Sequence, residues 1–345
     1  MHAKPLAKLL ILALVWAAAL AAGGAAAQAQ PIRIVTTTPD LASLARAVAG
    51  DLAAVSSISD GRDDPHFLQA KPSYALAARD ADLWVRVGLE LEVGWEPPLL
   101  EGARRPDLLP GGPRHLDASE KALKLDIPSG PISRDMGDVH PLGNPHWWLD
   151  PVNARLAAYA LAQRLSQLYP AHAPAFETNL AAFERRLDEA MFGPALVARL
   201  GGNTLWSLEL TNTLAEYLAG EGLASQLGGW KARLAAKRGA PLVIYHKSWV
   251  YLTNRFGLAV AAELEPKPGI PPSGGHIAQV VRIMRERGVK VILQEPFYPR
   301  NAADLAARQT GAQVLILPNT CGGLEGGQDY LALMNLLVDR LAEAL

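Results

Sequence analysis

Two separate stretches of the chain alternate short β-branched segments with helical ones, and this alternation restricts the possible folds most. The first stretch covers residues 32–88, and the second covers residues 241–345. Alternation of this kind predicts parallel strands joined by helices that cover the faces of a sheet. At 345 residues the chain also exceeds the usual size of one compact core. We therefore expect an α/β protein with two domains.

The region between the two stretches has a different character. Residues 102–143 are rich in proline, glycine and aspartate and predict a long surface loop, with a short strand near residues 115–119. Residues 152–169 predict a helix that Asp150 and Pro151 begin. A second helix is predicted from one apolar stripe, and Gly193 and Pro194 should end it; the stripe comprises Phe176, Leu180, Phe183, Leu187 and Met191. A helix of about 20 residues spans about 30 Å, so it can act as a rigid connector.

The first 29 residues predict a secretory signal peptide. Lys4 and Lys8 precede the apolar run LLILALVWAAALAA, and alanines follow it up to Ala29. A membrane anchor is the competing interpretation, but the run is short for a bilayer. No cysteine lies near the expected cleavage point, so we expect a periplasmic protein without a lipid anchor.

The charge and cysteine content exclude two further possibilities. Lysine and arginine total 33 against 34 aspartates and glutamates, and no long basic run is interleaved with aromatic residues. Nucleic acid is therefore a poor candidate partner. Cys321 is the sole cysteine, which excludes an intramolecular disulfide.

Three histidines stand where a loop leaves a predicted strand or begins a predicted helix. These are His66, His146 and His246. Taken alone, each is better explained as a polar surface residue or a capped core residue. Three imidazoles from distant segments, however, form most of a site for zinc or a similar divalent ion. His246 and Glu295 follow neighbouring strands at the edge of the sheet where ligands commonly bind.

The residues before two of these histidines support the same interpretation. His66 follows Asp63, Asp64 and Pro65, and His146 follows Asn144 and Pro145. Proline keeps the preceding backbone extended, and an acidic neighbour can accept a hydrogen bond from an imidazole that binds metal.

Several segments together resemble the zinc and manganese solute-binding proteins of ABC transporters. The resemblance covers nearly the whole chain after residue 29, and its segments are DDPHFLQAKPSYALAARDADLWVRVGLELE, GNPHWWLDP, LVIYHKSWVYLTNRFGL, PKPGIPPSGGHI, VKVILQEPFYPRNAADLAARQTGAQVL and DYLALMNLLVDRLAEAL. It implies two parallel-sheet lobes with flanking helices, one long connecting helix, and a metal site in the cleft between the lobes. We expect a metal-binding lobe over residues 30–170, the connecting helix within 171–200, and a second lobe over 201–345.

The resemblance also implies metal ligands. The family's first two histidines correspond to His66 and His146, and its third ligand corresponds to His246. Manganese-binding members commonly carry a carboxylate at the third place, so an imidazole there favours Zn²⁺ over Mn²⁺.

The fourth ligand is where this sequence departs from the family. The family usually has an aspartate after the last strand, whereas this chain reads LPNTCGG over residues 317–323. Glu295 is our first choice as a substitute, and Cys321 or a water molecule are the alternatives. The alternative role of Glu295 is to cap the next helix or orient a histidine that binds metal, and the alternative for Cys321 is a small buried apolar residue. His140 and His276 are expected to be accessory.

The function expected from these features is the high-affinity zinc-binding component of an ABC transporter, which delivers its ion to the permease in the inner membrane. We expect a monomer without enzymatic activity. A carrier of manganese or another divalent metal is the first alternative. A zinc hydrolase is the second, although no HExxH or GxSxG motif is present. An adhesin, or an organic-solute binder that uses Trp147 and Trp148, are further alternatives.

Overall fold

The computed structural model describes residues 30–130, 137 and 139–345. The predicted signal peptide, residues 1–29, lies outside this part of the chain. Within it, the strands form two four-stranded sheets, with the orders β2-β1-β3-β4 and β6-β5-β7-β8. The prediction of two α/β units is confirmed. The domain limits given above stay predictions.

The first sheet is built from residues 32–117. Strand β3 pairs in parallel with β1 and with β4, and Trp84 of β3 lies opposite His115 of β4. Helix α2 lies against β2, and α3 packs against α4 beside an apolar cluster that includes Trp84 and Trp95. The elements are β1 (Ile32–Thr36), α2 (Pro39–Ala49), β2 (Ala53–Ser57), α3 (Pro72–Arg79), β3 (Leu83–Arg86), α4 (Glu96–Ala103) and β4 (His115–Asp117).

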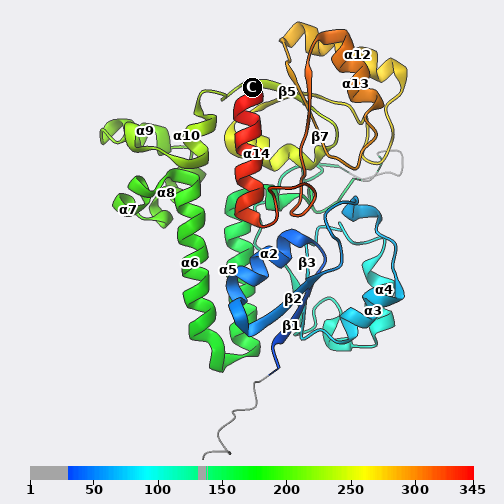
Figure 1. Ribbon diagram of the computed structural model, residues 1–345, viewed down its shortest axis with the longest axis vertical. Helices are drawn as coiled ribbons and strands as arrows, with labels where there is room; N and C mark the ends of the chain where they lie inside the picture. The colour runs from blue at the N-terminus through cyan, green and yellow to red at the C-terminus, as the bar shows by residue number, and fades with distance from the viewer. Residues whose placement is uncertain (1–29, 131–136, 138) are drawn as a thin grey trace, which may run out of the picture. The chain divides into compact units, whose positions relative to one another are not determined.

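The middle of the chain is helical (Figure 1). Asp150 caps the first of these helices, as predicted, by accepting a hydrogen bond from the backbone of Val152. The predicted apolar stripe lies on α6, which ends before Gly193 and contacts α5, α2 and α10. Its role as the connector stays a prediction. The elements are α5 (Pro151–Leu168), α6 (Ala173–Phe192), α7 (Pro194–Leu200), α8 (Gly202–Leu210), α9 (Leu214–Gly220) and α10 (Gly229–Ala235).

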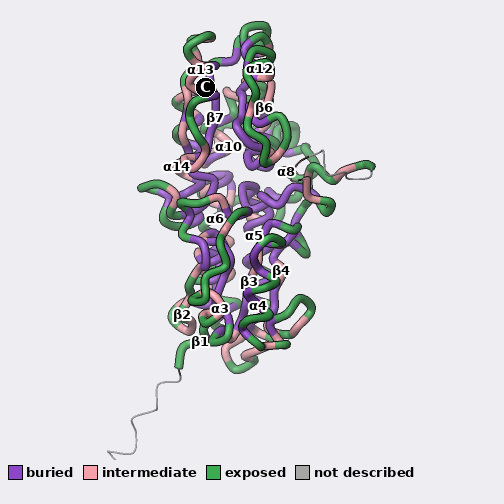
Figure 2. The backbone as a smooth tube through the Cα atoms, turned by 90° about the vertical axis from the view of Figure 1, so that its right-hand side faces the viewer, coloured by how far each residue is buried: buried purple, intermediate pink, exposed green. Residues whose placement is uncertain are grey.

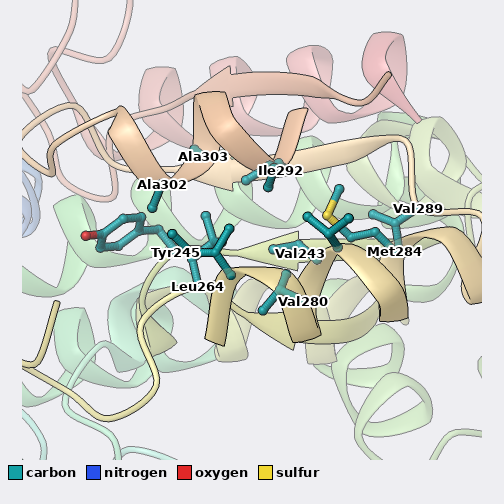
Figure 3. Close-up of a cluster of buried hydrophobic side chains, with 12 residues drawn as sticks. Val243, Tyr245, Leu264, Val280, Met284, Val289, Ile292, Ala302 and Ala303 are labelled. Carbon is teal, nitrogen blue, oxygen red and sulfur yellow. The ribbon is translucent and has the colours of Figure 1, made fainter. Parts of the chain in front are cut away.

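The second sheet has β5 at its centre, paired in parallel with β6 and β7, and β8 pairs in parallel with β7. The side chains of Val243 and Ile292, from β5 and β7, meet those of α12 and α13 in one apolar core (Figure 3). The elements are β5 (Pro241–Ile244), α11 (Val250–Phe256), β6 (Ala259–Glu263), α12 (Gly274–Arg287), β7 (Val291–Gln294), α13 (Asn301–Thr310), β8 (Gln313–Ile316) and α14 (Tyr330–Ala344).

Burial follows the pattern expected of sheets covered by helices. Figure 2 shows buried positions along strands such as β3 and β7, and exposed positions on turns of helices such as α4 and α12. No helix of the described residues is apolar over a length sufficient to cross a bilayer.

Candidate metal centre

The three predicted histidine ligands meet in the structure. One ligand atom of each lies within 4.8 Å of those of the other two. Their ring centroids are 5.1 Å apart for His66 and His146, 5.3 Å for His146 and His246, and 5.8 Å for His66 and His246. Tetrahedral zinc with Zn–N bonds of about 2.0 Å places the centroids of two coordinating imidazoles roughly 5 Å apart. The cluster therefore has the dimensions of a metal site.

Each histidine is held at a strand end or in a short turn. His66 lies in the turn η2 (Pro65–Phe67), His146 precedes η5 (Trp147–Leu149), and His246 lies between β5 and η8 (Lys247–Trp249). Their exposed fractions are only 8%, 2% and 8%. Their burial limits the contact of the three imidazoles with bulk water.

The two Asx-Pro-His segments share one local geometry. Oδ1 of Asp64 accepts a hydrogen bond from the backbone N–H of His66 at 3.0 Å and lies 2.7 Å from Nδ1 of the same histidine. Oδ1 of Asn144 makes the equivalent contacts with His146 at 3.0 and 2.9 Å. The expectation that an acidic neighbour orients His66 is confirmed, and of Asp63 and Asp64 it is Asp64 that makes the contact. Asn144 orients His146 in the same way.

The third imidazole is oriented by a residue that the sequence did not point to. Nδ1 of His246 lies 2.5 Å from Oε2 of Glu265, which follows the neighbouring strand β6. Glu265 also accepts a hydrogen bond from the backbone N–H of Gly269 at 2.9 Å. The two residues are 19 positions apart, so their contact depends on the pairing of β5 with β6 and leaves no local signal in the sequence.

These contacts determine which nitrogen binds metal. Because each Nδ1 faces an oxygen acceptor, the proton lies on Nδ1 and the Nε2 lone pair remains for coordination. Burial, together with the charges of His66 and His246, holds the pKa of His146 well below its ordinary value. A neutral imidazole is the form that binds metal.

Glu295 is buried at the end of β7 but lies outside the histidine group. Its Oε1 accepts a hydrogen bond from the hydroxyl of Ser248, and its Oε2 has no hydrogen-bond partner among the described residues. Burial raises the pKa of Glu295 to about 8. Direct coordination by Glu295 stays a prediction.

The segment after β8, where the family usually has an aspartate, is bound to helix α2. Asp40 accepts hydrogen bonds from the hydroxyl of Thr320 and from the backbone N–H of Cys321, the latter at 2.9 Å. The backbone of Asn319 accepts one from the indole of Trp148 at 2.7 Å. A Cβ at Gly61 would lie 2.2 Å from the carbonyl oxygen of Cys321, so this position requires glycine.

Cys321 itself takes part in the contact with helix α2, through Asp40. It is buried and is not a member of the histidine group. Burial and the neighbouring Asp40 raise the pKa of its thiol well above the ordinary value. These surroundings fit the alternative of a small buried residue better than that of a thiolate ligand.

The two accessory histidines have different positions. The ring centroid of His140 lies 5.3 Å from that of His66. His276 begins helix α12, and its Nε2 lies 2.9 Å from the carbonyl oxygen of Glu263. His140 is thus beside the cluster, whereas His276 contacts the end of β6.

Of the two tryptophans after His146, Trp148 lies beside the site. Trp147 and Trp148 are completely buried, and the ring of Trp148 lies 5.3 Å from that of His146. Because neither indole is exposed, they are unsuited to be a platform for an organic solute. The ring of Trp148 covers one side of His146.

Two cavities adjoin the cluster. A cavity of about 470 Å³ is lined by His66 and His246 and by apolar residues of α12 and α13. Its wall includes Tyr298, whose hydroxyl donates to Oδ2 of Asp64 at 3.0 Å. A smaller cavity of about 90 Å³ is lined by His140, His146 and His246.

Comparison with known proteins agrees with this geometry. A family model described as zinc-uptake complex component A, periplasmic (ZnuA), matches residues 34–191 and 220–344. The iron-binding protein YfeA of Yersinia pestis is 26% identical over 335 residues, which cover 96% of this chain and 91% of the relative. The high-affinity zinc uptake system protein ZnuA of Paracoccus denitrificans is 24% identical over 367 residues, with coverage of 96% and 97%.

A solved structure has the same fold. The crystal structure of ZnuA superposes with a TM-score of 0.66 at 20% identity and covers 91% of this chain and 99% of its own. The family model matches most of the chain, in the segments that carry all three histidines. This chain therefore belongs to the family of periplasmic zinc-uptake complex component A.

Proposed function

We propose that this protein captures Zn²⁺ in the periplasm and delivers it to the permease of an ABC transporter. The observation that carries the proposal is the group of three buried imidazoles, each with its Nδ1 against an oxygen and its ligand atom within 4.8 Å of the others. The family to which the chain belongs supports uptake rather than catalysis. We expect the protein to be a monomer that binds one ion, without a lipid anchor.

The donor set favours zinc over manganese. Nitrogen ligands suit zinc, whereas oxygen ligands suit harder ions such as Mn²⁺. YfeA is described as an iron-binding protein, so Fe²⁺ belongs in the same comparison. Because the imidazoles must be neutral to bind, zinc affinity should fall in acid.

The test is a competitive metal titration of the chain from residue 30 onward, stripped of metal and then reloaded. We expect one tightly bound Zn²⁺ per chain and much weaker binding of Mn²⁺ and Fe²⁺. If the protein bound Mn²⁺ or Fe²⁺ more tightly than Zn²⁺, that ion would be the cargo instead of zinc. Failure to bind any of the three ions in a 1:1 ratio would contradict a metal-carrier function.

A further inference from the structure

We propose that His140 is the fourth ligand of the metal and takes the place of the carboxylate that this chain lacks after β8. This inference rests on the proposed function, because it concerns the same ion. Tetrahedral zinc needs four ligands, and His66, His146 and His246 supply three. A fourth nitrogen would also increase the preference for zinc over manganese.

The first support is the distance between rings. The centroid of His140 lies 5.3 Å from that of His66, within the range of 5.1–5.8 Å found among the three clustered histidines. Two imidazoles on one tetrahedral zinc are expected to be roughly 5 Å apart. His140 lies outside the group in which all ligand atoms are within 4.8 Å of one another. Coordination therefore requires its half-buried ring to turn toward the ion.

The second support is a shared cavity. His140, His146 and His246 line the same space of about 90 Å³, together with Asp126 and Asn144. A water molecule needs only about 10–15 Å³ of space for its centre, so this cavity is large enough for an ion together with water. His140 therefore borders the same space as two of the clustered histidines.

The third support is the turn that positions His140. The carbonyl oxygen of His140 accepts a hydrogen bond from the backbone N–H of Gly143 at 3.2 Å, and Pro141 and Leu142 are between them. The next residue, Asn144, orients His146 through its side chain. One turn therefore sets the positions of both His140 and His146.

The other candidates each have a contact of their own that competes with coordination. Cys321 is held against Asp40, and Glu295 accepts a hydrogen bond from Ser248. Asp126 shares the small cavity, where its Oδ2 accepts a hydrogen bond from the amide of Asn144 at 3.3 Å. Asp126 is thus the competitor that an experiment must separate from His140.

The test compares His140→Gln with Asp126→Asn and with the matched control His276→Gln. Zinc affinity is measured by competitive titration, and the number of coordinated imidazoles by X-ray absorption at the zinc edge. We expect His140→Gln to weaken zinc binding at least about tenfold and to remove one imidazole, since a ligand matters no less than a residue that orients one. His276→Gln and Asp126→Asn should resemble the wild type. Thermal unfolding of the metal-free variants checks that each is folded.

The outcomes separate this inference from the proposed function. If the wild type holds zinc with three imidazoles and His140→Gln binds as tightly, the assignment of His140 is wrong but the zinc carrier stands. Loss of affinity in Asp126→Asn but not in His140→Gln would overturn the assignment in favour of the carboxylate. If the wild type binds no metal, the proposed function itself fails.

Discussion

Strands β5 and β8 end at the same edge of one parallel sheet, but the segments that follow them make different contacts. His246, after β5, joins the histidine cluster with its Nδ1 against Glu265. The residues after β8 are instead bound to helix α2 through Asp40, which accepts hydrogen bonds from Thr320 and Cys321. A place at the carboxyl end of a strand therefore allows a residue to bind metal, but its neighbours decide whether it does.

The largest effect is expected from the end of β5. His246→Ala removes one of three clustered imidazoles and should weaken zinc binding by more than about 100-fold, because loss of an orienting residue alone costs about 10- to 100-fold. The fold should be kept, since the alanine fits the space of a larger side chain. Competitive zinc titration and circular dichroism check this prediction. Unchanged zinc affinity would remove His246 from the site.

The corresponding change at the end of β8 should affect stability. Asp40→Ala leaves a buried hydroxyl and a buried backbone N–H without their acceptor, which should lower the free energy of unfolding by about 2–4 kcal/mol. Urea unfolding of the metal-free protein measures this loss. If Asp40→Ala kept its stability but lost zinc binding as strongly as His246→Ala, the segment after β8 would belong to the metal site.

Removal of the residue that orients His246 should have an intermediate effect. Glu265→Ala takes away the acceptor of the Nδ1 proton, so we expect zinc affinity to fall about 10- to 100-fold. A zinc titration beside that of His246→Ala measures the difference. A larger loss than in His246→Ala would contradict the assignment of the two roles.

Glu295 lies at the end of β7, the strand between β5 and β8. Its role should be visible in how the free energy of unfolding depends on pH. Its pKa is about 8 in the folded protein, against an ordinary value of 4.5, so the folded chain keeps a proton that the unfolded chain has lost. Its contribution to stability is therefore complete below about pH 4.5 and decreases by roughly 1.4 kcal/mol per pH unit as the pH rises toward 8.

The glutamine of the variant Glu295→Gln cannot titrate, so the variant should lack this pH-dependent contribution to stability. Its unfolding free energy, measured in urea from pH 5 to 8, should decrease less steeply than that of the wild type. Zinc affinity should stay the same. Equal slopes would show that Glu295 does not titrate in this range, and a loss of zinc affinity would instead support direct coordination.

The smallest effect is expected for Cys321→Ala. The thiol is buried against Asp40 and outside the histidine group, so its removal should cost less than about 1 kcal/mol of stability. Zinc affinity should agree with that of the wild type within the error of the titration. A clear loss of affinity would restore the thiolate as a ligand.

The local patterns of the sequence predicted the fold well. The alternation of strand and helix found both sheets, and even the three-residue strand at His115 was visible. The two Asx-Pro-His segments were also local, so the sequence indicated that an acidic residue just before His66 could orient it, and Asp64 does so. Features of this kind depend on neighbours in the chain, and these are what a sequence displays.

The rest depended on contacts between distant residues. Glu265 reaches His246 only because β6 pairs with β5, and Asp40 and Thr320 are 280 positions apart. The sequence placed Glu295 at the correct strand end but could not show that the hydroxyl of Ser248 donates a hydrogen bond to its carboxylate. A residue's position along a strand is thus more predictable than the partner its side chain meets.

The most direct test is to locate the zinc ion by anomalous diffraction at the zinc edge in crystals of the zinc-loaded protein. We expect one strong peak about 2.0–2.1 Å from a nitrogen of each of His66, His146 and His246. A peak elsewhere, or none among these three imidazoles, would contradict the assignment of this cluster as the site that carries the metal.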